Sequence, residues 1–72
     1  MEDCIVKSVE SSTIKKVGYC KSTNDLVIEF LNGNQYLYEK VPEYEFEGLV
    51  EAESVGTYFA DEIKDDYECF EL

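Results

Sequence analysis

Residues 26–38 read LVIEFLNGNQYLY and predict a β-hairpin. In the first half, Leu26, Ile28 and Phe30 recur at every second position, so they share one face of a strand. The turn that follows, Asn32-Gly33-Asn34, consists of residue types that tolerate positive φ, which a tight hairpin turn requires. The stretch therefore predicts two antiparallel strands joined by a short turn.

The returning strand is expected over residues 35–40, with Tyr36, Tyr38 and Lys40 on one face. Two earlier segments extend the hairpin into a meander: residues 4–8 as a short edge strand and residues 14–20 as a full strand. Gly18 marks a bulge or a point of close approach in the second of these. Turn clusters at residues 11–13 and 22–25 separate the strands, because Ser, Thr, Asn and Asp side chains bond the local backbone.

A helical half begins at Pro42, whose fixed φ and missing N–H suit the first turn of a helix. Acids at positions 43, 45 and 47 favour the positive end of that helix dipole. Ser54 is expected to cap a second helix that runs to about Lys64. Apolar residues at helical spacing mark the buried faces: Phe46, Leu49 and Val50 in the first helix, Phe59 and Ile63 in the second.

Residues 67–70 alternate and predict a last short strand. The expected fold class is therefore α+β: a small antiparallel three- to four-stranded meander followed by two short helices and a C-terminal strand. A chain of 72 residues forms one domain, which we expect to span residues 1–72.

Three cysteines, Cys4, Cys20 and Cys69, set the expected compartment. An odd count, no CxxC pair and an acidic start predict a reducing environment, so we expect a cytoplasmic protein with thiols that act as small buried hydrophobes. A small core without disulfides gains from self-association, and a homo-oligomer is expected.

Negative charge is concentrated in the second half of the chain. The net charge is −11, and residues 39–72 hold twelve of the seventeen acids but two of the six lysines. Nucleic acids are bound through Lys and Arg that neutralise phosphates, so a long nucleic acid is not an expected partner. No apolar run approaches the ~18 residues that a membrane span needs, and no membrane association is expected.

A series of short motifs runs along residues 8–70: Ser11-Ser12, Val17-Gly18-Tyr19, Leu26-Val27-Ile28-Glu29-Phe30, Asn32-Gly33, Tyr36-Leu37-Tyr38, Val41-Pro42, Ala52-Glu53-Ser54-Val55-Gly56-Thr57-Tyr58-Phe59, Ile63-Lys64 and Tyr67. In this order they resemble the KTSC domain, a family named for a C-terminal extension of some lysyl-tRNA synthetases and found as free-standing small proteins in bacteria and phages. The synthetase context implies RNA binding. Cys20 and Ala60 stand where the family often has aspartate and asparagine, and most of its basic residues near the second helix are absent, which argues against that role here.

Catalytic chemistry has little support in the sequence, and we expect no enzyme activity, no cofactor and no metal. The chain contains no His and no Arg, so neither cysteine chemistry nor acyl transfer has its usual base or oxyanion partner. The acids Asp61, Glu62, Asp65 and Asp66 are expected to be solvated charge, with a loose calcium site as the alternative.

Two groups of residues are candidates for a ligand site. Tyr36 and Tyr38 offer a stacking platform for a base, or they complete the core. The helix start at Ser54, Gly56 and Thr57, with Ser11 or Ser12, is expected to attract a phosphate, or it is an ordinary N-cap. Among the lysines expected near the sheet, which are Lys15, Lys16 and Lys40, Lys16 is the one assigned to phosphate contact.

These observations leave three hypotheses for a non-catalytic binding module. The first is a protein that binds or sequesters a small nucleotide-type ligand such as an immune signalling nucleotide. In the more specific form of this hypothesis, the protein is encoded by a phage. The second is an acidic interaction module or nucleic-acid mimic that inhibits a basic host protein. The third, implied by the resemblance, is an RNA-binding accessory domain.

Overall fold

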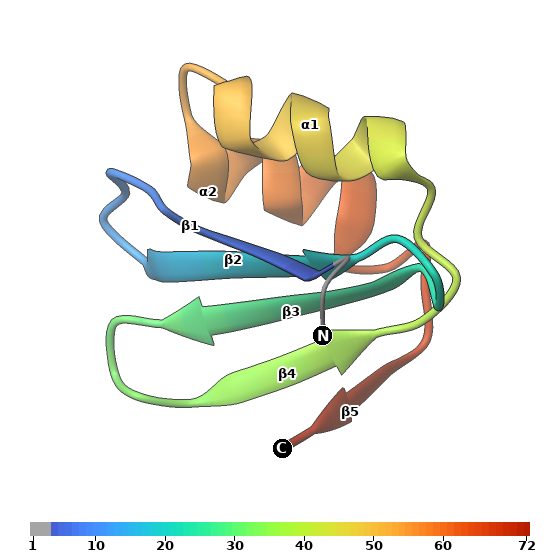
Figure 1. The fold of residues 1–72 in the computed structure, drawn as a ribbon. Helices are drawn as coiled ribbons and strands as arrows, with labels where there is room; N and C mark the ends of the chain where they lie inside the picture. Colours follow the sequence, from blue (N-terminus) through green and yellow to red (C-terminus); the bar gives the residue numbers. More distant parts are fainter. Residues whose placement is uncertain (1–3) are drawn as a thin grey trace.

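The computed structural model describes residues 4–72 and contains one five-stranded antiparallel sheet with the helices on one of its faces (Figure 1). The elements are β1 (Cys4–Ser8), β2 (Ile14–Cys20), β3 (Asp25–Phe30), β4 (Gln35–Tyr38), α1 (Glu43–Glu51), α2 (Val55–Tyr58), the π-helical turn η1 (Phe59–Ile63) and β5 (Cys69–Glu71). The strands lie side by side in chain order, with β5 returning after the helices to pair with β4. The predicted α+β class and the C-terminal strand are confirmed; residues 1–3 of the predicted domain lie outside the described residues.

The predicted hairpin is confirmed between β3 and β4. Gly33 has a φ of 95°, and the Phe30 backbone N–H donates to the Asn34 carbonyl across 2.9 Å. The first turn also forms as expected, because Ser11 Oγ accepts from the N–H groups of Thr13 and Ile14 at 3.1 and 3.2 Å. Local polar side chains thus set where the strands begin and end.

Two strand details differ from the prediction. The irregularity in β2 lies between Ile14 and Lys16, while Gly18 pairs regularly with Val6 and Val27, and a Cβ there would make an ordinary 3.6 Å contact. Gly18 is therefore neither a bulge nor a point of close approach. β4 ends at Tyr38, because Lys40 takes a left-handed φ of 58° as the chain turns towards α1, so Lys40 does not continue the tyrosine face.

Both predicted helices are present, and the second is unusual. Pro42 precedes α1 as its N-cap residue, and Ser54 caps α2 by accepting from the Thr57 N–H at 3.3 Å. After one turn, α2 widens into η1, where the Lys64 N–H donates to the Phe59 carbonyl five residues back at 2.9 Å. Phe59 and Ala60 of this turn, and Lys64 after it, lie across from the β3–β4 hairpin.

The hydrophobic core lies between the helices and one face of the sheet. Its buried members are Ile14, Val17, Tyr19, Leu26, Ile28, Tyr38, Val41, Phe46, Leu49, Val55, Phe59 and Ile63. Tyr38 is 4% exposed, and the Tyr19 hydroxyl donates to the Val41 carbonyl at 2.6 Å while accepting from the Asn24 amide at 2.8 Å. Within residues 4–72, no helix is long and apolar enough to cross a membrane.

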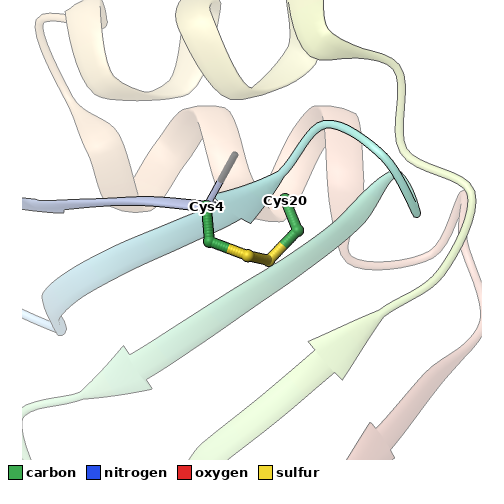
Figure 2. The surroundings of a disulfide bond; sticks show 2 residues. All are labelled: Cys4 and Cys20. Atoms are coloured by element: carbon green, nitrogen blue, oxygen red, sulfur yellow. A yellow bond between two sulfur atoms is a disulfide. The ribbon is translucent and has the colours of Figure 1, made fainter. Parts of the chain in front are cut away.

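The cysteine prediction was wrong. Cys4 and Cys20 form a disulfide across the first two strands, and the sulfurs project from the face opposite the helices (Figure 2). The two residues are direct register partners, which pairing of β1 with β2 creates and the linear spacing does not reveal. Cys69, the free thiol, is exposed rather than buried. The cytoplasmic assignment, which rested on reduced thiols and on the acidic start of the chain, stays a prediction.

Candidate ligand-binding cleft

A cleft of about 660 Å³ opens between the β3–β4 hairpin and the second helix. Four aromatic residues form its apolar wall: Phe30, Tyr36, Tyr38 and Phe59. Polar groups of Asn32, Asn34, Lys64 and Asp65 lie around it. The hairpin and the π-helical turn therefore supply opposite sides of one cavity.

The four rings form a continuous edge-to-face chain. Phe30 contacts Tyr36 on one side, with ring centroids 5.8 Å apart and ring planes at 82°. On its other side it contacts Phe59, with centroids 5.7 Å apart and planes at 74°. Phe59 in turn meets Tyr38 at 5.5 Å and 82°. Such contacts fix ring orientation. Tyr36 is half-buried, so it retains surface for a ligand, whereas Tyr38 is mainly a core residue that lines the cleft.

Burial keeps the Tyr38 hydroxyl protonated. Desolvation, followed by the neighbouring Cys69 on β5, raises the pKa of Tyr38 to about 12. At neutral pH this hydroxyl is therefore a hydrogen-bond donor and carries no charge. Lys64 is the one Lys among the residues lining this cleft, and it directly follows η1.

The residues proposed for a phosphate site are brought together, but elsewhere. Ser11, Ser12, Ser54, Gly56 and Thr57 line a second, polar cleft of about 360 Å³. Gly56 and Thr13 line both clefts and so form the wall between them. The hydroxyl residues grouped from the sequence do lie together, and Gly56 and Thr13 stand between them and the tyrosines.

The chemistry of the second cleft favours a structural role. Ser54 Oγ accepts from the Thr57 N–H and donates to Thr57 Oγ1 at 2.9 Å, so its bonding capacity is largely used. Glu10 and Glu53 also line the cleft and place negative charge beside any anion. A Cβ at Gly56 would lie 2.9 Å from Thr13 Oγ1, which explains the glycine by packing.

Lys16 does not join either group. It is exposed on β2 and lines a hollow on the opposite face of the sheet, together with Gly18 and Val27. One ligand cannot touch both Lys16 and the tyrosine cleft of the same chain. Lys64, directly after the π-helical turn, is the lysine that lines the tyrosine cleft, and no local sequence pattern indicated that turn.

Glu45 is a buried carboxylate that the sequence presented as a helix-dipole acid. It is 7% exposed, and its two oxygens accept hydrogen bonds from the hydroxyls of Tyr58 (2.8 Å) and Tyr67 (3.1 Å). The hydrogen bond to Glu45 is the main cause that raises the pKa of Tyr58 to about 12. Burial, followed by the hydrogen bond to Glu45, raises the pKa of Tyr67 to about 12.

This buried group clamps α1 to α2 and to the segment before β5. Gly48 makes room for it, because a Cβ at that position would overlap Tyr58 Oη. Both hydroxyls are donors to a carboxylate that they hold in place, which is a stabilising arrangement. Among residues 4–72, no three His, Cys, Asp or Glu side chains are grouped to hold a metal ion, so Asp61, Glu62, Asp65 and Asp66 do not converge on a calcium site.

Known proteins share the sequence pattern and the fold of this chain. The family model of the KTSC domain matches residues 10–67. The chain belongs to the KTSC domain family. The crystal structure of KTSC domain protein YPO2434 from Yersinia pestis superposes with a TM-score of 0.88 and 31% identity, covering 96% of this chain and 97% of that one. The confirmed resemblance thus extends to the whole sheet and both helices.

Two further relatives come from other bacteria. A protein of Tsukamurella paurometabola is 40% identical over 53 residues, which cover 74% of this chain and 79% of the relative. An uncharacterized protein of Stutzerimonas stutzeri is 36% identical over 52 residues, covering 72% and 73%. These names state no ligand and no reaction.

Proposed function

We propose that this KTSC domain binds a small nucleotide-type ligand in the aromatic cleft and does not transform it. The observation that carries the proposal is the convergence of four aromatic rings and one lysine on a single cavity. A base would pack against Tyr36, and its phosphate would pair with Lys64. The volume of about 660 Å³ lies within the ~300–1,000 Å³ typical of small-molecule sites.

The polar groups around the rings suit such a ligand. The amides of Asn32 and Asn34 offer donors and acceptors for the edge of a base. Lys64 acts as a point charge on phosphate, while its neighbour Asp65 limits how much negative charge the cleft accepts. We therefore expect a ligand with few phosphates, such as a cyclic nucleotide or an ADP-ribose derivative.

The charge of the whole chain separates small anions from polymers. The net charge is −11, and physiological salt screens charges over ~8 Å, so a bound ligand interacts mainly with the charges next to the cleft. A long RNA or DNA would instead pass over the acidic surface without enough cations to neutralise its phosphates. A free-standing KTSC protein in a phage would use such a site to sequester a host signalling nucleotide.

Binding without turnover is proposed from the groups that line the cleft. The hydroxyl of Tyr38 keeps its proton well above neutral pH. The chain has no histidine to move a proton near pH 7. The thiol of Cys69 also lines the cleft, but no histidine lies beside it as a base, and Lys64 and Asp65 hold and orient a ligand.

The test is titration calorimetry and thermal unfolding with ADP-ribose and with a cyclic dinucleotide. A ligand at about 100 times its Kd stabilises the fold by about 2.7 kcal/mol, which raises the Tm of a domain of this size by roughly 11–22 °C. Lys64→Gln should weaken binding of the nucleotide but not of the corresponding nucleoside. No thermal shift with either nucleotide at ~1 mM would remove the proposal.

A second candidate is an interaction with a basic protein, and it rests on the distribution of acids. The helical half presents exposed carboxylates at Glu47, Glu51, Glu53, Asp61, Glu62, Asp65 and Asp66. Pull-down from lysate at rising salt is the test, because a partner held by these charges should be lost steeply as ionic strength increases. Capture that is insensitive to salt would argue against this candidate.

A further inference from the structure

The face of the sheet opposite the helices carries an apolar row that crosses all five strands. Val6 pairs with Gly18, Gly18 with Val27, Val27 with Leu37, and Leu37 with Phe70. Direct register partners point to the same face, and the adjacent Cys69 lines the helix-side cleft, so Phe70 points away from the helices. Val6 is 67% exposed and Phe70 is 50% exposed.

The row has a hollow near one end and a projecting ring at the other. Gly18 has no side chain, and a mostly apolar hollow of about 340 Å³ lies over it between Val6, Val27 and the disulfide. A cavity of about 150 Å³ already holds benzene. The hollow is thus large enough for the ring of a phenylalanine, and Phe70 is the exposed phenylalanine on the same face.

We propose that this face is a homodimer interface in which Phe70 of each copy enters the Gly18 hollow of the other. A two-fold axis parallel to the strands, midway between β3 and β4, places β2 of one copy over β5 of its partner. Because strands are spaced about 4.8 Å apart, β2 and β5 are equally distant from that axis. The same operation sets Val27 against Leu37, so one symmetric contact covers the row from Gly18 to Phe70 and leaves Val6 at its margin.

Charge favours the same pairing. The exposed face of the sheet carries two carboxylates, Asp25 and Glu29, with Lys16 directly beside its register partner Glu29, whereas the carboxylates of α1 and η1 lie on the helical side. Two copies with a net charge of −11 each repel least when their helical layers point away from one another. Packing through the sheets gives that arrangement.

The available area predicts a weak dimer. One face of a molecule that measures 29 × 23 × 23 Å offers on the order of 600 Å² per copy, below the ~800 Å² per partner of a standard complex. Association should therefore depend on concentration, with a dimer dominating at ~1 mM and a monomer at ~1 µM. This interface lies opposite the ligand cleft and is independent of it.

Sedimentation equilibrium between about 1 µM and 1 mM tests the proposal. The background should carry Cys69→Ser, which excludes an intermolecular disulfide without a reductant that would open Cys4–Cys20. Phe70→Ser should raise the dimer Kd at least about tenfold. Gly18→Leu should do the same by filling the hollow, since Gly18 has no positive φ and has room for a Cβ.

The matched control is Tyr44→Ser, which removes a 68% exposed aromatic side chain from α1 on the helical side. It should leave the dimer Kd unchanged, and circular dichroism should show that every variant is folded. A parent protein that stays monomeric at ~1 mM overturns the proposal. The proposal is also overturned if the dimer Kd stays unchanged in both folded variants, Phe70→Ser and Gly18→Leu.

Discussion

The two clefts on either side of Gly56 and Thr13 differ in kind, although they share a wall. The larger one is aromatic and has Lys64 at its edge, whereas the smaller one is lined by hydroxyls and two glutamates. In the larger cleft, Tyr36 keeps exposed ring surface. In the smaller cleft, the hydroxyl of Ser54 is already bonded to Thr57. Residues that look equally suited to binding in the sequence therefore have different roles once their bonding partners are known.

The largest effect is expected at Tyr38, and it tests whether this cleft residue is also part of the hydrophobic core. Tyr38→Ala should destabilise the protein by about 3–4 kcal/mol, because it empties a buried site that contacts Phe59. Urea denaturation measures this loss. Tyr38→Phe is the control and should cost about 1 kcal/mol, since the ring remains and one hydroxyl is lost. A folded, fully stable Tyr38→Ala variant would show that the ring is not part of the core.

A second prediction concerns the Glu45 clamp, which holds α2 and therefore Gly56 in the wall between the two clefts. Glu45→Ala should cost about 2–3 kcal/mol, because two tyrosine hydroxyls lose a charged acceptor. Glu45→Gln keeps the size and one carbonyl acceptor and should cost less. If Glu45→Ala were as stable as the parent protein in thermal unfolding, the carboxylate would have no role in the clamp.

Alkaline pH should weaken the same region. Burial and hydrogen bonding to Glu45 raise the pKa values of Tyr58 and Tyr67 to about 12, above the unfolded value of 10. A raised folded pKa means that the contribution is complete below pH 10 and is lost as the pH rises from 10 to 12. Chemical denaturation across this range should show the decline, and the double variant Tyr58→Phe/Tyr67→Phe should show a shallower one.

The smallest effect separates capping from ligand binding in the hydroxyl cleft. Ser54→Ala should cost about 1 kcal/mol by removing the cap of α2. It should leave the affinity for any ligand of the aromatic cleft unchanged. A loss of nucleotide affinity well beyond the loss of stability would restore the phosphate role that the sequence suggested for Ser54, Gly56 and Thr57.

Much of the fold follows from local sequence patterns, because each element carries its own signal. Alternation predicted β3, a mixture of apolar and lysine residues predicted β2, the turn around Gly33 predicted the hairpin, and Ser54 predicted the start of the second helix. The KTSC resemblance was also visible in the order of short motifs. These are features that neighbouring residues determine by themselves.

The parts that were missed depend on residues far apart in the chain. The disulfide forms because strand register sets Cys4 directly beside Cys20. The buried carboxylate of Glu45 accepts its hydrogen bonds from Tyr58 and Tyr67, which lie much later in the chain. Lys64 reaches the aromatic cleft through a π-helical turn that no local pattern indicated. The spacing of Gly48 three residues after Glu45 was the one signal that the helix makes room for a partner there.

The central claim is that the aromatic cleft binds a flat, anionic ligand through Tyr36, and calorimetry on two variants tests it most directly. With a nucleotide that binds the parent protein, Tyr36→Phe should retain the affinity to within about threefold, while Tyr36→Ala should lower it at least about tenfold, in line with the energy of stacking one base. Both variants should remain folded. Equal affinity in the parent and in Tyr36→Ala would contradict the account.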